Sequence, residues 1–247
     1  MSAAAPFRPI VLTPTFNNGG TLERILSEVE SLGIPLLIVN DGCTDQTREV
    51  LTRWDGSTGP RRAIVVHHDR NRGKAAALRT GFAAARAAGF THAATIDTDG
   101  QLEPSDLPAL LVLAERHPRA LILGARSEQI EHCPPKNLFA RRLSNTAIRL
   151  QTGVHISDSQ CGLRVYPLAL MQMLKVASGR FGFEAEVITR AAWAGCSVLE
   201  IPVRCTYPPG NARVTHYRPR RDTPRAVLMH VRLLVRSWIP WPHARWS

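Results

Sequence analysis

Short apolar runs alternate with stretches of helical periodicity through the first half of the chain. Apolar runs bounded by turn residues are typical of buried strands, whereas apolar residues at i, i+3, i+4 and i+7 indicate helices. We expect strands at 9–13, 35–39, 63–67, 91–96 and 120–124, and helices at 21–32, 45–54, 73–88 and 104–117. Strands that alternate with helices predict an α/β fold with a mostly parallel central sheet flanked by helices.

The second half of the chain is less regular. We expect helices at 138–152, 167–176 and within 181–195, a loop leading into a strand over 157–166, and a strand at 198–203. The Pro-, Arg- and His-rich segment 207–222 is expected to be a mobile loop. A basic amphipathic helix is predicted at 224–238, with one apolar face formed by Val227, Leu228, Val231, Leu234 and Val235.

The chain contains no stretch that resembles a flexible linker between independent domains. We therefore expect a single domain over residues 1–222. A basic amphipathic helix and a Trp-rich tail follow it at 223–247.

Two acidic residues follow the predicted strand 91–96 directly. Asp97 and Asp99 are two residues apart, so their side chains leave the extended backbone on the same side. Carboxylate oxygens in this position can bind a hard divalent cation, which in turn can hold a diphosphate. The alternative is a solvated acidic loop that precedes the helix starting near Pro104.

Two further polar motifs lie where ligands of parallel α/β sheets bind, at the carboxyl ends of strands. Asp41 follows the second strand and can accept hydrogen bonds from a nucleobase or ribose, or serve only a local turn. Gly73 and Lys74 open a helix whose N-terminus favours an anion. The spacing is not that of a P-loop, so a kinase or ATPase is not expected.

The charge of the chain predicts an anionic partner. The formal net charge is +11 and the pI is about 10.4, which fits nucleic acid, an anionic membrane surface or phosphorylated substrates. The five cysteines show no C-x-x-C spacing, which argues against a zinc site or a disulfide framework. No signal peptide and no transmembrane stretch is evident, so we expect a cytoplasmic protein.

The C-terminal segment indicates contact with the inner face of a membrane. Arginines of the amphipathic helix suit lipid phosphates, and tryptophans suit the bilayer interface. The tryptophans are Trp238, Trp241 and Trp246. The alternative is a helix that packs on the core, with the tryptophans covering its edge.

Eight short motifs occur in a fixed order between about residues 8 and 205. They are TPTFN, VNDGCTD, NRGKAAALRTG, DTDGQ, GARS, RRLSN, DSQCGLRVY and GFEAE. In this order the chain resembles the family 2 glycosyltransferases of GT-A fold, and among them the dolichol- or polyprenol-phosphate mannosyl- and glucosyltransferase type. The resemblance implies a nucleotide-binding half at about 8–125 and an acceptor half at about 126–222.

The resemblance also implies roles for individual residues. It assigns the nucleotide to Pro14, Thr15, Asn17 and Asp41. From the helix start at Gly73 and from the acidic motif we expect Lys74 and Asp97 to contact the nucleotide sugar as well. It assigns Mg²⁺ or Mn²⁺ to Asp97, Asp99 and Gln101, and the phosphate of the acceptor to Arg126 and Arg142. Asn18 and Asn40 stand where the family usually has acids, which leaves the base of the donor open.

The resemblance implies an inverting reaction in which the metal and Arg126 neutralise the leaving diphosphate, with Asp99 among the catalytic residues. The acid pair that serves alcohol acceptors in the family is missing, and an acceptor that is already an anion needs no base. We therefore expect metal-dependent transfer from a nucleotide-diphosphate sugar to a membrane lipid, with a polyprenyl phosphate as the acceptor. If the acceptor is an alcohol, Asp158 is the candidate base.

Three alternatives stay open at this point. The first is a non-phosphorylated acceptor such as a glycolipid, pigment or polyketide. The second is a nucleotidyltransferase, which would carry a Gly-rich basic loop after the first strand where this chain has PTFNNGGT. The third is a basic nucleic-acid-binding protein, but the chain has no recognition motif for nucleic acid, so that partner is not expected.

Overall fold

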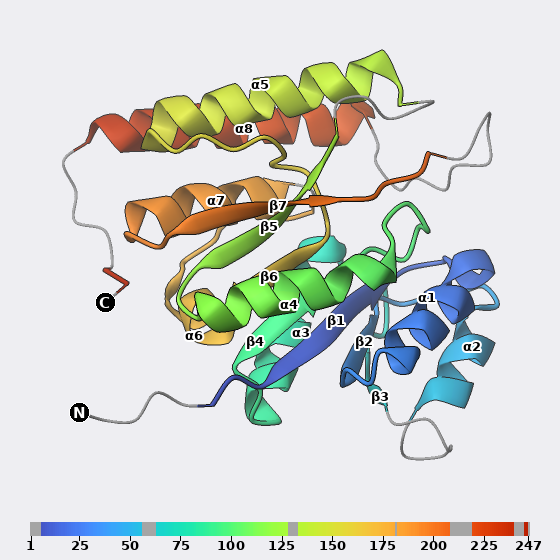
Figure 1. Ribbon diagram of the computed structural model, residues 1–247. Coiled ribbons are helices and arrows are strands. Elements are labelled where there is room, and N and C mark those ends of the chain that lie inside the picture. Colours follow the sequence, from blue (N-terminus) through green and yellow to red (C-terminus); the bar gives the residue numbers. More distant parts are fainter. Residues whose placement is uncertain are drawn as a thin grey trace.

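A seven-stranded sheet runs through the whole molecule (Figure 1). The computed structural model describes residues 6–55, 63–127, 133–180, 182–207, 219–239 and 245–246. The strand order is β3-β2-β1-β4-β6-β5-β7, and β6 is antiparallel to both of its neighbours while the other pairs are parallel. The strands are β1 (Pro9–Thr15), β2 (Leu36–Asn40), β3 (Ala63–His67), β4 (His92–Thr95), β5 (Leu121–Arg126), β6 (Arg164–Pro167) and β7 (Val198–Val203).

Helices cover both faces of this sheet and bury a core on each. The helices are α1 (Gly19–Ser31), α2 (Thr47–Trp54), α3 (Lys74–Ala87), the 3₁₀ turn η1 (Pro104–Asp106), α4 (Leu107–Arg116), α5 (Pro135–Thr152), α6 (Leu168–Met173), α7 (Gly182–Trp193) and α8 (Pro219–Trp238). One core lies under α1, α2 and α4, and the other under α3, α6 and α7. The predicted α/β class is therefore confirmed.

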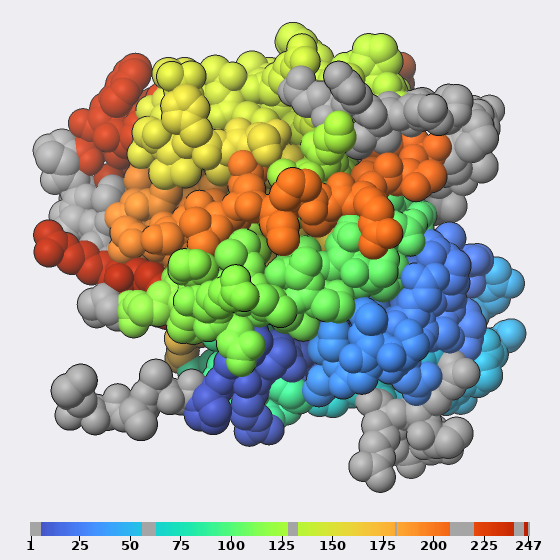
Figure 2. Space-filling model, viewed as in Figure 1, coloured from blue at the N-terminus to red at the C-terminus, as the bar shows by residue number. Residues whose placement is uncertain are grey.

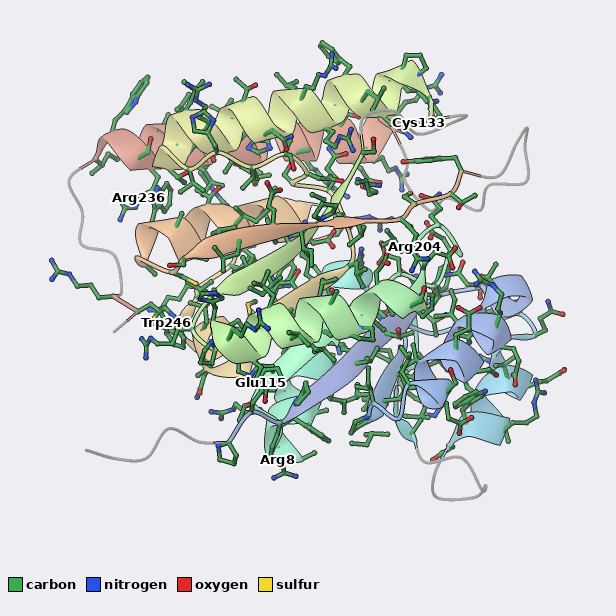
Figure 3. All side chains as sticks on the ribbon, viewed as in Figure 1. Arg8, Glu115, Cys133, Arg204, Arg236 and Trp246 are labelled. Carbon is green, nitrogen blue, oxygen red and sulfur yellow. The ribbon has the colours of Figure 1, made fainter. Side chains whose placement is uncertain are left out.

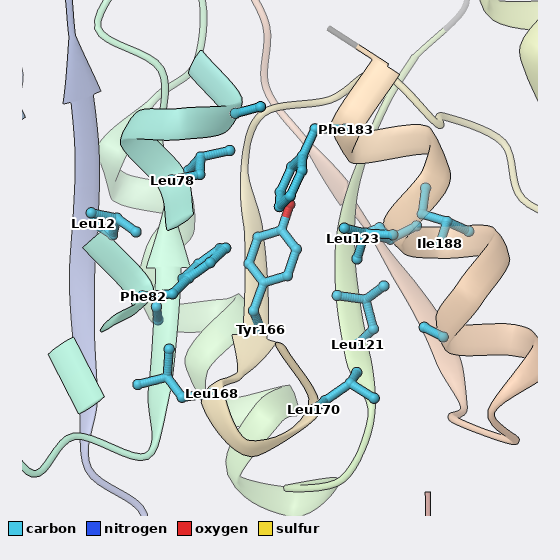
Figure 4. Packing of buried hydrophobic residues seen from close by; sticks show 14 of the residues in the cluster. Leu12, Leu78, Phe82, Leu121, Leu123, Tyr166, Leu168, Leu170, Phe183 and Ile188 are labelled. Carbon is cyan, nitrogen blue, oxygen red and sulfur yellow. The ribbon is translucent and has the colours of Figure 1, made fainter. Parts of the chain in front are cut away.

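The sequence explains how α3 comes to lie close to the sheet and to carry Lys74 at its start. Four of its six buried residues are alanine or glycine, and a Cβ at Gly81 would lie 2.3 Å from the Leu12 side chain on β1. Farther along the sheet the space is filled by larger side chains, and Tyr166 packs against Phe82 with ring centroids 5.0 Å apart (Figure 4). The first turn of α3 is thereby fixed at the carboxyl ends of β1 and β2.

The helix α8 differs from the prediction in its start and in its orientation. It begins at Pro219 instead of 224, so residues 219–222 are helical and not part of a loop; residues 208–218 lie outside the described residues. Four of the five residues of the predicted apolar face are exposed and Leu234 is half-buried, whereas Met229 and Leu233 make the packed face. In the space-filling view α5 (yellow-green) lies along the top of the molecule, across the orange segment 182–207 from the blue N-terminal residues of β1 and α1 (Figure 2).

The tryptophans of the C-terminal segment divide between two environments. Trp246 packs on the body of the protein, where its backbone N–H and its ring Nε1 donate to the carbonyls of Ala194 and Arg119, each at 2.8 Å. Trp238 is 75% exposed, and Trp241 lies outside the described residues. Among the described residues no helix combines the length and the apolar character needed to cross a bilayer.

Candidate active site

Lys74 connects the two halves of the molecule at the carboxyl end of the sheet. Its ammonium Nζ lies 2.6 Å from Oδ1 of Asp97, which follows β4, and 3.1 Å from Oε1 of Glu184 on α7. Burial disfavours the charged ammonium, but the two carboxylates raise the pKa of Lys74 above its ordinary value. Gly162 makes room for this arrangement, because a Cβ there would lie 2.1 Å from Oδ2 of Asp97.

The carboxylate of Asp41 is directed into the protein and not toward an open site. It is 3% exposed, and Oδ1 lies 2.7 Å from Nδ1 of His68. The backbone N–H groups of Arg72 and Gly73 donate to its two oxygens at 2.9 and 2.7 Å. Asp41 therefore fixes the turn that precedes Lys74, and its expected contact with a nucleobase or ribose does not follow from this geometry.

The end of β1 is tied to the turn after β2. Asn17 has a positive φ of 51°, and its Oδ1 accepts a hydrogen bond from the backbone N–H of Thr44 at 2.9 Å. Thr15 is buried and lies beside Thr98, and Pro14 is half-buried in β1. A cavity of about 300 Å³ opens next to this turn, lined by Asn40, Gly42, Cys43, Arg48, Thr52, His67, His68 and Asp69.

The acidic loop after β4 offers oxygen ligands without forming a complete metal cage. The backbone N–H of Gln101 donates to Oδ1 of Asp99 at 3.1 Å, and the buried Nε2 of Gln101 has no hydrogen-bond partner. Within the described part of the chain no three His, Cys, Asp or Glu side chains come together to hold a metal. Mg²⁺ and similar ions are commonly held by one or two carboxylates together with substrate phosphates, so Asp97 and Asp99 fit such an ion.

Arg126, the last residue of β5, is clamped by Asp158. Its Nε and Nη2 donate to the two carboxylate oxygens at 2.6 and 3.0 Å, and Asp158 is fully buried. Burial would raise the pKa of Asp158, but the hydrogen bonds and charge of Arg126 lower it below its ordinary value. Asp158 thus positions a guanidinium, and its oxygens are occupied where a base would need one free.

The basic pair on α5 is split between two sides of the helix. Arg141 is buried, and its Nη1 lies 3.4 Å from Oδ2 of Asp158 and donates to the carbonyl of Arg126 at 3.2 Å. Arg142, the residue that we expected to contact phosphate, is exposed. Successive residues on a helix are about 100° apart, so only one of the two can face Asp158.

The chain after β7 brings the acidic loop and Arg126 together. Leu102 pairs with Cys205, and the backbone N–H of Thr206 donates to the carbonyl of Gln101 at 2.9 Å. The next residue, Tyr207, accepts from Nη1 of Arg126 at 3.4 Å. The cluster of Lys74, Asp97, Asp99, Gln101 and Arg126 therefore combines a paired lysine, two carboxylates, an amide and a fixed guanidinium at one edge of the sheet.

Two members of the site could be assigned no definite role from sequence. Arg141 and Glu184 both lie in motifs that carried the resemblance, RRLSN and GFEAE, but neighbouring residues of the same type made the choice ambiguous. The fold decides between them. Glu184 faces Lys74, whereas Glu186 binds the backbone N–H groups of Ala177 and Ser178.

A sequence model described as "Glycosyl transferase family 2" matches residues 10–172, which is more than half of the chain. The chain belongs to glycosyl transferase family 2. It is therefore a glycosyltransferase enzyme, as the order of its motifs indicated.

Relatives within the family include enzymes named for polyprenyl phosphates. The chain is 30% identical over 176 residues to a dodecaprenyl-phosphate galacturonate synthase of Rhizobium johnstonii, covering 67% of this chain and 49% of that relative. It is 21% identical over 215 residues to a UDP-N-acetylglucosamine–dolichyl-phosphate N-acetylglucosaminyltransferase of Methanococcus voltae, covering 80% and 85% of the two chains. These names support the resemblance to the polyprenol-phosphate type.

A similar solved structure is glucosyl-3-phosphoglycerate synthase of Mycobacterium tuberculosis, in complex with Mn²⁺, UDP and phosphoglyceric acid. The TM-score is 0.66 at 19% identity, covering 95% of this chain and 80% of that chain. At this identity the likeness shows the fold, and it confirms the expected GT-A architecture.

Proposed function

We propose that this family 2 enzyme transfers a sugar, with inversion, from a nucleotide-diphosphate donor to a polyprenyl phosphate. The observation that carries the proposal is the clamp on Arg126. At the junction of the two halves the protein presents a fixed cation, and the neighbouring carboxylate, Asp158, is occupied by that cation. Such a site suits an acceptor that brings its own negative charge and needs no proton removed.

The reaction needs no base from the protein, because the attacking phosphate oxygen carries no proton that must be removed. An oxygen of the acceptor phosphate forms a bond to the anomeric carbon as the bond from that carbon to the donor diphosphate breaks. The electron pair leaves with the nucleoside diphosphate, and the product is a lipid phosphate diester of the sugar. The developing charge on the leaving group is what a site of this kind must stabilise.

We assign a divalent cation, Mg²⁺ or Mn²⁺, to Asp97, Asp99 and Gln101. When bound, the ion would supply charge neutralisation for the diphosphate. The two carboxylates of the loop support this choice. In Gln101 the ligand would be the carbonyl oxygen Oε1, and the buried Nε2, which has no partner, is left to donate to a phosphate oxygen. Lys74 holds the carboxylate of Asp97 in place, and Pro14, Thr15 and Asn17 form the strand end beside which the nucleotide would lie.

Asp158 fits this function as a positioning residue. An alcohol acceptor would need a base, but Arg126 and Arg141 occupy the Asp158 oxygens and lower its pKa, which weakens it as a base. The names of the relatives favour the same acceptor class. We further propose that residues 1–222 form one catalytic domain and that the enzyme acts on the cytoplasmic face of a membrane.

Binding of nucleoside diphosphates tests the metal and donor part of this proposal. Wild-type protein should bind one of a panel of nucleoside diphosphates at least tenfold more tightly with Mn²⁺ than without it. Asp99→Ala should lose this enhancement in calorimetry, whereas Glu103→Gln, a carboxylate four residues farther along the same loop, should keep it. An Asp99→Ala protein with full metal enhancement would refute the assignment.

A further inference from the structure

Exposed apolar side chains concentrate on two neighbouring helices. Of the eleven large hydrophobic side chains that are exposed among the described residues, nine lie on α5, on α8 or on the residue after α8. We call these nine residues the α5–α8 surface. They are Phe139, Leu143, Leu150, Val227, Leu228, Val231, Val235, Trp238 and Ile239.

On α5 the exposed apolar residues form one stripe. Phe139, Leu143 and Leu150 are four and seven residues apart, which places them on one face of a helix. The buried residues of α5 lie on the opposite side and include Ser144 and Ile148. The stripe is therefore the side of α5 turned away from the protein core.

On α8 the exposed apolar residues also lie opposite the packed ones. Met229 and Leu233 are 5% and 1% exposed, whereas Leu228 is 68% and Trp238 75% exposed. A helix that is apolar on both sides is expected where two partners cover it. The protein core covers one side of α8, and no described residue covers the other.

The two helices lie side by side, so their outer faces form one surface. His230 of α8 lies 3.1 Å from the hydroxyl of Ser144, and its carbonyl accepts from Nε2 of Gln151 at 2.9 Å. Arg232 of α8 reaches Glu186 of α7 at 3.1 Å, so α8 rests on α7 as α5 does. Figure 1 shows α5 and α8 together at one edge of the molecule, and Figure 3 shows side chains of α5 pointing outward from that edge.

The charges around this surface have one sign. The helix α5 contains no acidic residue, and the one acid of α8, Asp222, is 5% exposed with Oδ1 3.2 Å from Nε of Arg180. The basic residues of the two helices are Lys136, Arg141, Arg142, Arg149, Arg220, Arg221, Arg225, Arg232 and Arg236. An apolar surface bordered by arginines and free of exposed acids complements an anionic partner with an apolar interior.

We propose that the α5–α8 surface is the face on which the enzyme docks to an anionic lipid bilayer. This inference rests on the proposed function, since the acceptor would be drawn from that bilayer. The helix α5 links the docking surface to the candidate active site. Arg141 contacts Asp158 from its inner side while Phe139 and Leu143 lie on its outer side, so the clamp on Arg126 is about one helix diameter, some 10 Å, from the surface.

Co-sedimentation with lipid vesicles tests this docking surface. The triple variant Phe139→Gln, Leu228→Gln, Trp238→Gln changes only side chains that are at least 68% exposed, so it should fold as the wild type does. Its partitioning onto vesicles made of equal parts phosphatidylcholine and phosphatidylglycerol should fall by about tenfold or more. A control with Ile64→Gln and Val112→Gln, which are exposed elsewhere, should bind as the wild type does.

Charge variants separate the electrostatic part of docking from the apolar part. Arg149→Gln with Arg225→Gln should weaken binding to the mixed vesicles and leave the weak binding to pure phosphatidylcholine unchanged. Equal binding of the wild type and the triple variant to mixed vesicles would overturn the proposal. A wild-type dimer in solution that the triple variant converts to a monomer would also overturn it, because a second copy would then cover the surface.

Failure of docking and failure of the proposed function give different results. Asp99→Ala should bind vesicles as the wild type does, because none of the nine residues of the α5–α8 surface belongs to the acidic loop. The triple variant should still transfer sugar to a short-chain isoprenyl phosphate that is dissolved in water, and should lose transfer to a long-chain acceptor in vesicles. Transfer to both acceptors at wild-type rates would contradict docking while leaving the proposed function intact.

Discussion

At the residue scale, the contrast between Arg126 and Arg204 shows which ion pairs matter. Arg126 and Asp158 have side chains that are 12% and 0% exposed, so little water competes with their hydrogen bonds. Arg204 makes a similar set of contacts with Asp106, but its side chain is 65% exposed. Removing the charge of a buried carboxylate leaves its arginine uncompensated, whereas an exposed pair is screened by water.

Replacing Asp158 by Asn should destabilise the protein by about 3 kcal/mol in urea-induced unfolding. The pKa of Asp158 is lower in the folded protein than in the unfolded chain, so its contribution is present above about pH 4 and is lost as the pH falls through the folded pKa. As the pH falls below about 4, the free energy of unfolding of Asp158→Asn should therefore decrease less steeply than that of the wild type. Asp106→Asn serves as the exposed control and should have a much smaller effect; equal losses would refute the clamp.

Arg126→Ala should impair the acceptor more than the donor. A charge-assisted hydrogen bond to phosphate is worth about 1.5–3 kcal/mol, so KM for a short-chain isoprenyl phosphate should rise by roughly 10- to 100-fold. The affinity for the nucleoside diphosphate in the presence of Mn²⁺ should change less than threefold by calorimetry. Equal losses for donor and acceptor would show that Arg126 does not distinguish them.

At the scale of elements, α8 shows the limit of a pattern of apolar positions. The periodicity of residues 224–238 identified a helix and its apolar stripe, but a second apolar pair, Met229 and Leu233, makes the packed side. The helix start at Pro219 was missed because Pro224 suggests a helix start: a proline lacks the N–H for the i→i−4 hydrogen bond, yet here it lies inside the helix as its sixth residue. Patterns within one helix do not reveal which of two apolar sides the rest of the protein covers.

Packing between α5 and α8 should respond to acid. Burial lowers the pKa of His230, which lies between the uncharged side chains of Ser144 and Gln151. A histidine whose folded pKa is below the unfolded value near 6.5 stabilises the fold above that pH, and this stabilisation is lost as the pH falls through the folded pKa. The Tm of the wild type should therefore fall more between pH 7.5 and about pH 5 than the Tm of His230→Gln. An equal fall for both proteins would contradict this account.

At the scale of the whole molecule, the α/β class, most element positions and the order of the motifs followed from the sequence. Lys74, Asp97 and Asp99 lie at strand ends as expected, because parallel strands place their carboxyl ends at one edge. The directions of side chains did not follow. Asp41 turns into a buried network with His68, and Arg141 faces Asp158 while Arg142, the expected phosphate ligand, is exposed. These directions depend on contacts between residues far apart in the chain.

Transfer to a polyprenyl phosphate is the central claim, and product analysis tests it directly. The purified protein would be given a panel of nucleotide-diphosphate sugars with Mn²⁺ or Mg²⁺, with and without polyprenyl phosphate, and the lipid fraction analysed by mass spectrometry. We predict a lipid whose mass equals polyprenyl phosphate plus one sugar residue, formed from at least one donor, dependent on metal and absent with Asp99→Ala. A sugar transferred only to non-phosphorylated acceptors, with the polyprenyl phosphate recovered unchanged, would contradict the account.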